Sequence, residues 1–375
     1  MKRLWIDDDA AFRAFVESLP PGQPVALDTE FDRTRTYYPV FALLQVGVGR
    51  ECVALVDALA LKEWSPLGSL LGDPSRRKYL FSASNDLPIL HQACGTVPAS
   101  VFDVQVAAGF CGESGVQGLK AVLERRLGIV LPKTETRSDW TRRPLSAQQL
   151  SYAGDDVAYL TEVGEWYESA LRANGNLSWF QEEMEEAFCR EEAYGQPPVE
   201  EAWRRLGFLH HHPGDPQAVR RAVGLAIWRE GKAREIDCAK PRLLTEEQLN
   251  WCAAENPATL ADLMKMPNCW PKRIRPHGQE ILEVLAHPPQ GTYRERAEKH
   301  FTPERKARLR KLSDRVMGIA ASCARQRLID PALACSRGDA DRWATLHLDK
   351  LPQEGRICRG WRKELLQAGL DQIRP

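Results

Sequence analysis

Asp28 and Glu30 are two carboxylates that stand two residues apart in the apolar segment VALDTEF, residues 25–31. On a β-strand this spacing directs both side chains to the same face of the sheet. Two carboxylates on one face repel each other unless a cation lies between them. The pair therefore indicates a metal site, with an exposed edge strand that carries acidic residues as the alternative.

Three further residues could join this pair. Asp86 lies at a predicted junction between a strand and a helix, where an aspartate that caps the helix is the simpler interpretation. Tyr152 and Asp156 are four residues apart in a predicted helix, so they share one face as either a functional pair or an ordinary surface pair. Gly154 costs that helix about 1 kcal/mol relative to alanine, which indicates that a backbone segment or a ligand approaches closely there.

Together these residues supply four carboxylates and a phenol. Hard oxygen donors of this kind suit Mg²⁺ or Mn²⁺ better than zinc. Two such ions about 4 Å apart stabilise both the attacking and the leaving oxygen when a phosphodiester is hydrolysed. A phenol beside the ions could orient the attacking water. The combination predicts metal-dependent phosphodiester hydrolysis.

The elements that must position these residues are predicted to form an α/β domain. Short β-prone segments cover residues 25–31, 41–48, 52–56 and 78–81. Gly49 and Arg50 separate two of them as in a hairpin. A helix is expected to start near Asp86, and a capping box at Ser146 is expected to open one long helix that runs to about Tyr167. Strands followed by helices favour a mixed sheet flanked by helices.

The remainder of the chain is predicted to be all-helical. The segment from Tyr194 to Pro198 reads as a hinge, and Pro288-Pro289 separates two helical units. We therefore expect an α/β domain at residues 1–195 and two small helical domains at 212–288 and 289–375.

The charge of the chain is distributed unevenly. The formal net charge is zero, but residues 1–200 carry −10 and residues 201–375 carry +10. The acidic half could hold metal ions and the basic half a polyanion, whereas two ordinary solvated surfaces are an equally good interpretation of the counts. The sequence predicts no membrane span, no secretory signal and no obligate protein partner. The 10 scattered cysteines are expected to be reduced thiols in a cytoplasmic protein.

The order and context of the motifs resemble those of the ribonuclease D family. The resemblance rests on VALDTEF with the downstream Tyr38-Pro39 and Leu44-Gln45, on SNDL at 84–87, on FDVQ at 102–105, and on SDWTRRPLS at 138–146 leading into YAGDDVAYL at 152–160. That family belongs to the DEDD 3′-5′ exonucleases that carry a tyrosine in the third motif.

The resemblance implies a role for each candidate residue. Asp28 and Glu30 would form the first motif, Asp86 the second, and Tyr152 with Asp156 the third. It also implies a ribonuclease-H-like exonuclease domain, two divalent metal ions, and release of nucleoside 5′-monophosphates from tRNA precursors and other small RNAs with a free 3′ end.

The helical part is similar to the HRDC domain, a nucleic-acid-binding module, and then to a second, more degenerate copy of it. The first likeness is carried by AIWRE at 226–230, Ala233-Arg234, Pro241-Arg242, Leu249 and His277-Gly278, and the second by PALA at 331–334, Arg337 and GWR at 360–362.

The chain also departs from the family pattern. Asn85 replaces the usual glutamate before the second-motif aspartate, and Arg337-Gly338 replaces a more basic pair. Asp155 beside Asp156 makes the register ambiguous, and the Tyr-x-x-x-Asp spacing selects Asp156 because Asp155 points about 100° away around the helix.

Three residues are candidate contacts to the terminal nucleotides, namely Phe31, Gln45 and Trp140. For Phe31 a role in core packing is an equal alternative. Two other functions compete with the exoribonuclease: a DNA 3′-5′ exonuclease, and an inert scaffold that binds nucleic acid. The presence of all four carboxylates and the tyrosine favours an active enzyme.

Overall fold

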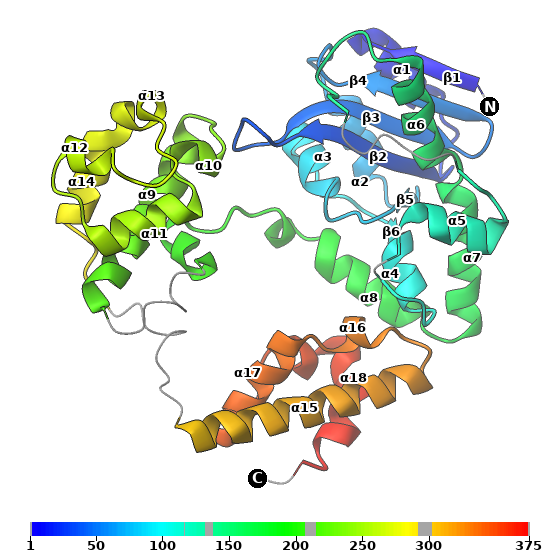
Figure 1. Ribbon diagram of the computed structural model, residues 1–375. Helices are drawn as coiled ribbons and strands as arrows, with labels where there is room; N and C mark the ends of the chain where they lie inside the picture. The colour runs from blue at the N-terminus through cyan, green and yellow to red at the C-terminus, as the bar shows by residue number, and fades with distance from the viewer. Residues whose placement is uncertain (1, 116, 132–137, 207–214, 292–301, 374–375) are drawn as a thin grey trace. The chain divides into compact units, whose positions relative to one another are not determined.

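The computed structural model describes residues 2–115, 117–131, 138–206, 215–291 and 302–373. Its N-terminal part contains a six-stranded sheet in the order β1-β4-β3-β2-β5-β6 (Figure 1). The strands are β1 (Lys2–Ile6), β2 (Val25–Asp32), β3 (Val40–Val48), β4 (Cys52–Asp57), β5 (Lys78–Leu80) and β6 (Val101–Asp103).

The pairing within this sheet confirms the predicted mixed arrangement. β3 and β4 are antiparallel, as expected for the hairpin at Gly49, whereas β1 is parallel to β4 and β5 is parallel to both β2 and β6. Most residues at the centre of β3 and β4 are fully buried, since helices cover the sheet. The eight helices that follow or separate the strands are α1 (Asp9–Ser18), α2 (Ser65–Gly72), α3 (Leu87–Cys94), α4 (Val104–Gly109), α5 (Leu119–Leu127), α6 (Ala147–Ala158), α7 (Leu160–Ala173) and α8 (Leu177–Phe188).

The prediction of one long helix from Ser146 to Tyr167 is wrong in its second half. The capping box at Ser146 does open α6, with the side chains of Ser146 and Gln149 bonding each other's backbone N–H groups. The backbone then leaves helical geometry at Tyr159, where φ is −115° and ψ is −2°, and α7 begins at Leu160. The break lets each helix follow its own packing partner, because α6 packs on β4 while α7 packs on β5 and α4.

The chain divides into two compact units that do not follow the linear order of the predicted domains. One unit consists of residues 1–31, 41–194 and 303–375, and the other of residues 32–40 and 195–302. The second unit is helical, as predicted, and has its own core around Val223, Leu249 and Ile281. Its elements are η2 (Val199–Arg205), α9 (Pro216–Glu235), α10 (Lys240–Leu243), α11 (Glu246–Glu255), α12 (Leu260–Leu263), α13 (Pro271–Ile274), η4 (Arg275–His277) and α14 (Gly278–Ala286). The expected domain start at residue 212 lies outside the described residues.

The C-terminal segment is also helical, and it packs on the α/β domain. It comprises α15 (Pro303–Gln326), α16 (Pro331–Ala334), α17 (Arg337–Leu348), η5 (Arg356–Cys358) and α18 (Gly360–Leu370). Val316, Trp343 and Leu366 form a core of its own, whereas Trp361 is buried in the core of the α/β domain. Arg362 of α18, 2% exposed, donates to both carboxylate oxygens of Glu183 in α8 at 2.6 and 2.7 Å. Within the described residues, no helix is long and apolar enough to cross a membrane.

Candidate active site

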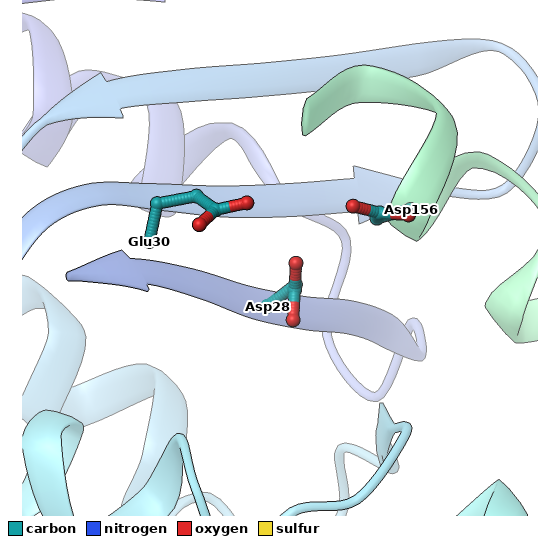
Figure 2. A group of neighbouring side chains, drawn as sticks. All are labelled: Asp28, Glu30 and Asp156. Carbon is teal, nitrogen blue, oxygen red and sulfur yellow. The ribbon is translucent and has the colours of Figure 1, made fainter. Parts of the chain in front are cut away.

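Three carboxylates from two elements meet beside the sheet. Asp28 and Glu30 project from β2 and Asp156 from α6, and each offers an oxygen atom within 4.8 Å of the others (Figure 2). This confirms that the alternating spacing places Asp28 and Glu30 on one face. Among the described residues, no other group of acidic, histidine or cysteine side chains is arranged in this way.

A glycine on the neighbouring strand allows α6 to come close enough to deliver Asp156. Gly47 lies on β3, and a Cβ atom added there would stand 2.7 Å from the carbonyl oxygen of Val157. That distance is below van der Waals contact, so any side chain at this position would push α6 and Asp156 away from the sheet. The role of Gly47 is invisible in the sequence, because the partner backbone lies 110 residues further along the chain.

Burial and mutual repulsion make the charged state of this cluster unfavourable. Burial, reinforced by the charges of Asp86, Asp156 and Glu30, raises the pKa of Asp28 well above its ordinary value. Burial and the charges of Asp156 and Asp86 raise the pKa of Glu30 to about 8. Burial also raises the pKa of Asp156 to about 6. A divalent cation would relieve this repulsion, and an all-oxygen donor set suits a hard ion such as Mg²⁺ or Mn²⁺. The residues present therefore fit the expected metal ions.

Asp86 lies next to this group rather than within it. It occupies the N-cap position of α3, but its side chain makes no capping hydrogen bond. The structure therefore excludes helix capping, the simpler of the two roles that the sequence suggested for Asp86. Instead its Oδ1 atom accepts a hydrogen bond of 2.5 Å from the hydroxyl of Thr29 on β2. The 4% exposed carboxylate is close enough to raise the pKa of both Asp28 and Glu30. Asn85, the departure from the family pattern, donates to the hydroxyl of Ser82 at 3.1 Å, within the same turn.

Asp103 holds the turn that carries Asp86, and sequence reasoning assigned it no role. Its carboxylate accepts backbone N–H groups from Ser82 and Ala83 before α3, and from Gln105 and Val106 at the start of α4. The side chain is 2% exposed and joins two strand-to-helix junctions. The available signal was its place in the segment FDVQ at residues 102–105, one of the segments that carry the family resemblance.

Asp155 and Gly154 have a structural explanation that distinguishes them from Asp156. The Asp155 carboxylate pairs with Arg3 of β1 at 3.1 Å. A Cβ atom at Gly154 would lie 2.8 Å from Nε of the same arginine. A close approach at Gly154 does occur, but the approaching group is the Arg3 side chain and not the backbone segment or ligand that was predicted. Asp155 is directed to β1 rather than to the carboxylate cluster.

Tyr152 lies beside the cluster, as its spacing from Asp156 predicts. Its phenol lies near the Asp156 carboxylate, and burial together with the charges of Asp156 and Glu30 raises the pKa of the phenol. The ring of Trp140, 7% exposed, is tilted against the Tyr152 ring with centroids 6.0 Å apart.

Of the other two candidate nucleotide contacts, Phe31 is half-buried on β2. Gln45 is fully buried in β3, opposite Leu55, and its amide atoms find no hydrogen-bond partner among the described residues. Trp140 therefore lies near the carboxylate cluster because its ring contacts Tyr152, whereas Gln45 is buried inside the sheet.

Comparisons with known proteins agree with this site. A family model described as 3′-5′ exonuclease matches residues 4–166, and a model described as HRDC domain matches residues 220–285. The ribonuclease D of Cronobacter turicensis is 32% identical over 98% of this chain and 99% of its own. The ribonuclease D of Escherichia coli is 31% identical over 100% of this chain and 98% of its own. The crystal structure of Escherichia coli RNase D, described as an exoribonuclease involved in structured RNA processing, superposes with a TM-score of 0.84 at 30% identity and covers 99% of this chain and 98% of that chain.

The ribonuclease-H-like sheet, the flanking helices and the acidic cluster define a 3′-5′ exonuclease domain, followed here by an all-helical HRDC domain. Matches of this extent and identity are specific. The chain belongs to the ribonuclease D family and is a hydrolase of the 3′-5′ exoribonuclease type.

Proposed function

We propose that this enzyme removes nucleoside 5′-monophosphates from free 3′ ends of RNA, with tRNA precursors and other small structured RNAs as substrates. Two divalent ions would be held by Asp28, Glu30, Asp86 and Asp156. The observation that carries the proposal is the convergence of carboxylates from β2 and α6 at a partly buried site. The relatives named ribonuclease D, and the solved structure described as acting in structured RNA processing, favour RNA over DNA.

Each residue of the site has its own role in the proposed hydrolysis. Two divalent ions, when bound, neutralise charge on the attacking and leaving oxygens of a phosphodiester. Asp28, Glu30, Asp86 and Asp156 would hold them, and Tyr152 would orient the attacking water. The oxygen of that water would bond to the phosphorus of the terminal phosphodiester as the water gives up a proton. The bond from this phosphorus to the 3′ oxygen of the penultimate nucleotide would break, and that oxygen would take up a proton.

The helical unit would supply contacts to RNA. Trp270, at the start of α13, is 62% exposed, and the guanidinium of Arg273 lies 4.5 Å from its ring centroid. Lys272 and Arg275 are exposed beside it. An exposed aromatic among cations is suited to stacking on an unpaired base while the cations contact phosphates. The net charge of +10 on residues 201–375 is shared between this unit and the C-terminal helices, and it favours RNA contacts by that half of the chain as a whole.

The reducing environment of the cytoplasm is the proposed place of action. All ten cysteines are free thiols in the structure, from Cys52 in β4 to Cys358 in η5.

A single assay tests the activity and its polarity. Unstructured RNA labelled at its 5′ end should be shortened in a ladder of single-nucleotide steps, and EDTA should stop the reaction. The same RNA with a 3′-phosphate should be digested far more slowly, because the site must receive a free terminus. Equal rates on a matched DNA strand would indicate a general 3′-5′ exonuclease, cleavage of a circular RNA would indicate an endonuclease, and no cleavage with intact binding would indicate a scaffold.

Tyr152→Phe should lower kcat while it leaves RNA binding intact. The variant keeps the ring beside Trp140 but removes the hydroxyl that orients the water, so the loss falls mainly on the transition state. We expect a fall in kcat of about tenfold or more, because misplaced reactants lose rate steeply. Tyr159→Phe, at the junction between α6 and α7, is the matched control and should retain the wild-type kcat. If Tyr152→Phe also retained it, Tyr152 would be a packing residue.

A further inference from the structure

The loop between β2 and β3 belongs to the helical unit. Residues 32–40 connect the strand that carries Asp28 and Glu30 to the next strand of the sheet, yet they form one compact unit with residues 195–302. The loop begins two residues after Glu30 and one residue after Phe31. Because the loop continues directly from β2, contacts that hold the loop also restrain the end of β2.

The backbone of the loop is fixed by the turn that follows α9. Oδ1 of Asp237 accepts the N–H groups of both Tyr37 and Tyr38, each at 3.0 Å. The N–H of Ala239 donates to the carbonyl of Arg35 at 3.0 Å. Asp237 has a left-handed φ of 45°, a conformation that aspartate, asparagine and glycine adopt more readily than other residues.

The side chain of Tyr37 enters a buried ionic cluster on α9 and α10. Its hydroxyl donates to Glu230 and accepts from Nε of Arg234 at 3.0 Å. Arg234 and Lys240 also pair with Glu230, at 2.9 and 3.0 Å. Glu230 is 7% exposed, and although burial opposes ionisation, hydrogen bonds from Tyr37, Lys240 and Arg234 lower the pKa of its carboxyl to about 2. The cluster is therefore ionised at neutral pH and holds the phenol from several sides.

These contacts are more than a connecting loop requires. Strands β2 and β3 are neighbours in the sheet, and two neighbouring strands can be joined by a turn of two to five residues. Here residues 33–39 lie between the two strands, and the segment 32–40 belongs to the helical unit, where the Tyr37 ring also lies 5.6 Å from the Arg234 guanidinium. Tyr37 and its partners therefore anchor the loop to the helical unit.

We propose that Tyr37 and Asp237 are positioning residues for the exonuclease site: the helical unit holds the 32–40 loop and so fixes the end of β2 that carries Glu30 and Phe31. This inference rests on the proposed function, because it assigns Glu30 to the catalytic cluster. The helical unit then contributes to the rate of the chemical step as well as to RNA binding. Its two contributions are separable, because loss of binding raises KM whereas a misplaced Glu30 lowers kcat.

The first test is a pair of tyrosine variants assayed on saturating unstructured RNA. Tyr37→Phe keeps the ring and removes the hydroxyl from the ionic cluster, and Arg234 and Lys240 still neutralise Glu230, so the unit should remain folded with a two-state melt near that of the wild type. We expect kcat to fall about five- to tenfold with little change in KM, because a small displacement of a catalytic group is costly. Tyr38→Phe is the matched control one residue along, since no hydrogen bond of its hydroxyl is seen among the described residues, and it should leave kcat unchanged.

The second test uses two substitutions at Asp237, to glycine and to asparagine, because both residues tolerate its left-handed φ. Asp237→Gly removes the acceptor for both backbone N–H groups, whereas Asp237→Asn keeps an oxygen at the same place. We expect Gly to lower kcat as Tyr37→Phe does and Asn to restore most of it. Equal kcat for both variants and the wild type would overturn the proposal.

Amide hydrogen exchange supplies a readout that does not depend on activity. In Tyr37→Phe and Asp237→Gly, exchange should become faster at residues 30–32 at the end of β2, and remain unchanged across β4 (Cys52–Asp57). Unchanged exchange at residues 30–32 would overturn the inference. If the wild-type protein hydrolysed no RNA, the proposed function would fail while the exchange experiment still decided whether the loop anchors β2.

Discussion

Asp28→Asn and Asp156→Asn should each lower kcat by about a thousandfold, because each removes one ionic oxygen donor from the site where charge develops in the transition state. The substitutions keep the size and shape of the side chains. In the metal-free protein they should also raise the unfolding temperature at neutral pH. Burial and repulsion raise the pKa of both carboxyls, so replacement by a neutral amide relieves an unfavourable charge.

The matched control is Asp155→Asn, one residue from Asp156 on the same helix. Asp155 pairs with Arg3 and is directed away from the cluster, so its loss should leave most of kcat. The measurements are steady-state rates over a range of Mg²⁺ or Mn²⁺ concentrations and thermal unfolding with EDTA. If Asp155→Asn were as inactive as Asp156→Asn, or if Asp28→Asn retained the wild-type rate at limiting metal, the assignment of the site would be wrong.

Glu183→Ala should lower the free energy of unfolding by about 3–5 kcal/mol, because it leaves a buried guanidinium without its partner. Arg362 is 2% exposed and directs two donors to Glu183. The indole Nε1 of Trp361 donates to the same carboxylate at 2.8 Å. These three groups join α18 to α8, so we expect the C-terminal helices to detach from the α/β domain at lower urea concentration.

Glu186→Ala is the comparison on the same helix. Glu186 pairs with Arg359, whose side chain is 66% exposed, and a solvent-exposed pair contributes at most about 1 kcal/mol. Urea unfolding followed by tryptophan fluorescence reports both variants, since Trp361 and Trp179 lie in this contact with ring centroids 6.0 Å apart. A similar loss for the two variants would show that Arg362 is stabilised by something other than Glu183.

The sequence by itself determined the elements whose signals are local. The alternation of Asp28 and Glu30 fixed their common face, because side chains on a strand alternate with a period of two. The capping box at Ser146 marked the start of α6 correctly, since a cap depends on residues only three positions apart. The ordered motifs indicated the family, and the Tyr-x-x-x-Asp spacing placed Tyr152 beside Asp156.

Only the tertiary structure decided the features that depend on residues far apart in the chain. From the sequence Asp86 is equally suited to capping a helix, and only the fold shows that its carboxylate instead accepts a hydrogen bond from the hydroxyl of Thr29, 57 positions away. The break at Tyr159 follows from the different packing partners of α6 and α7, and Gly47 matters because a helix backbone lies against it. The 32–40 loop joins the helical unit through Asp237, about 200 positions from the tyrosine N–H groups that it accepts. Such contacts are set by how the whole chain packs, and no local pattern of residue types specifies them.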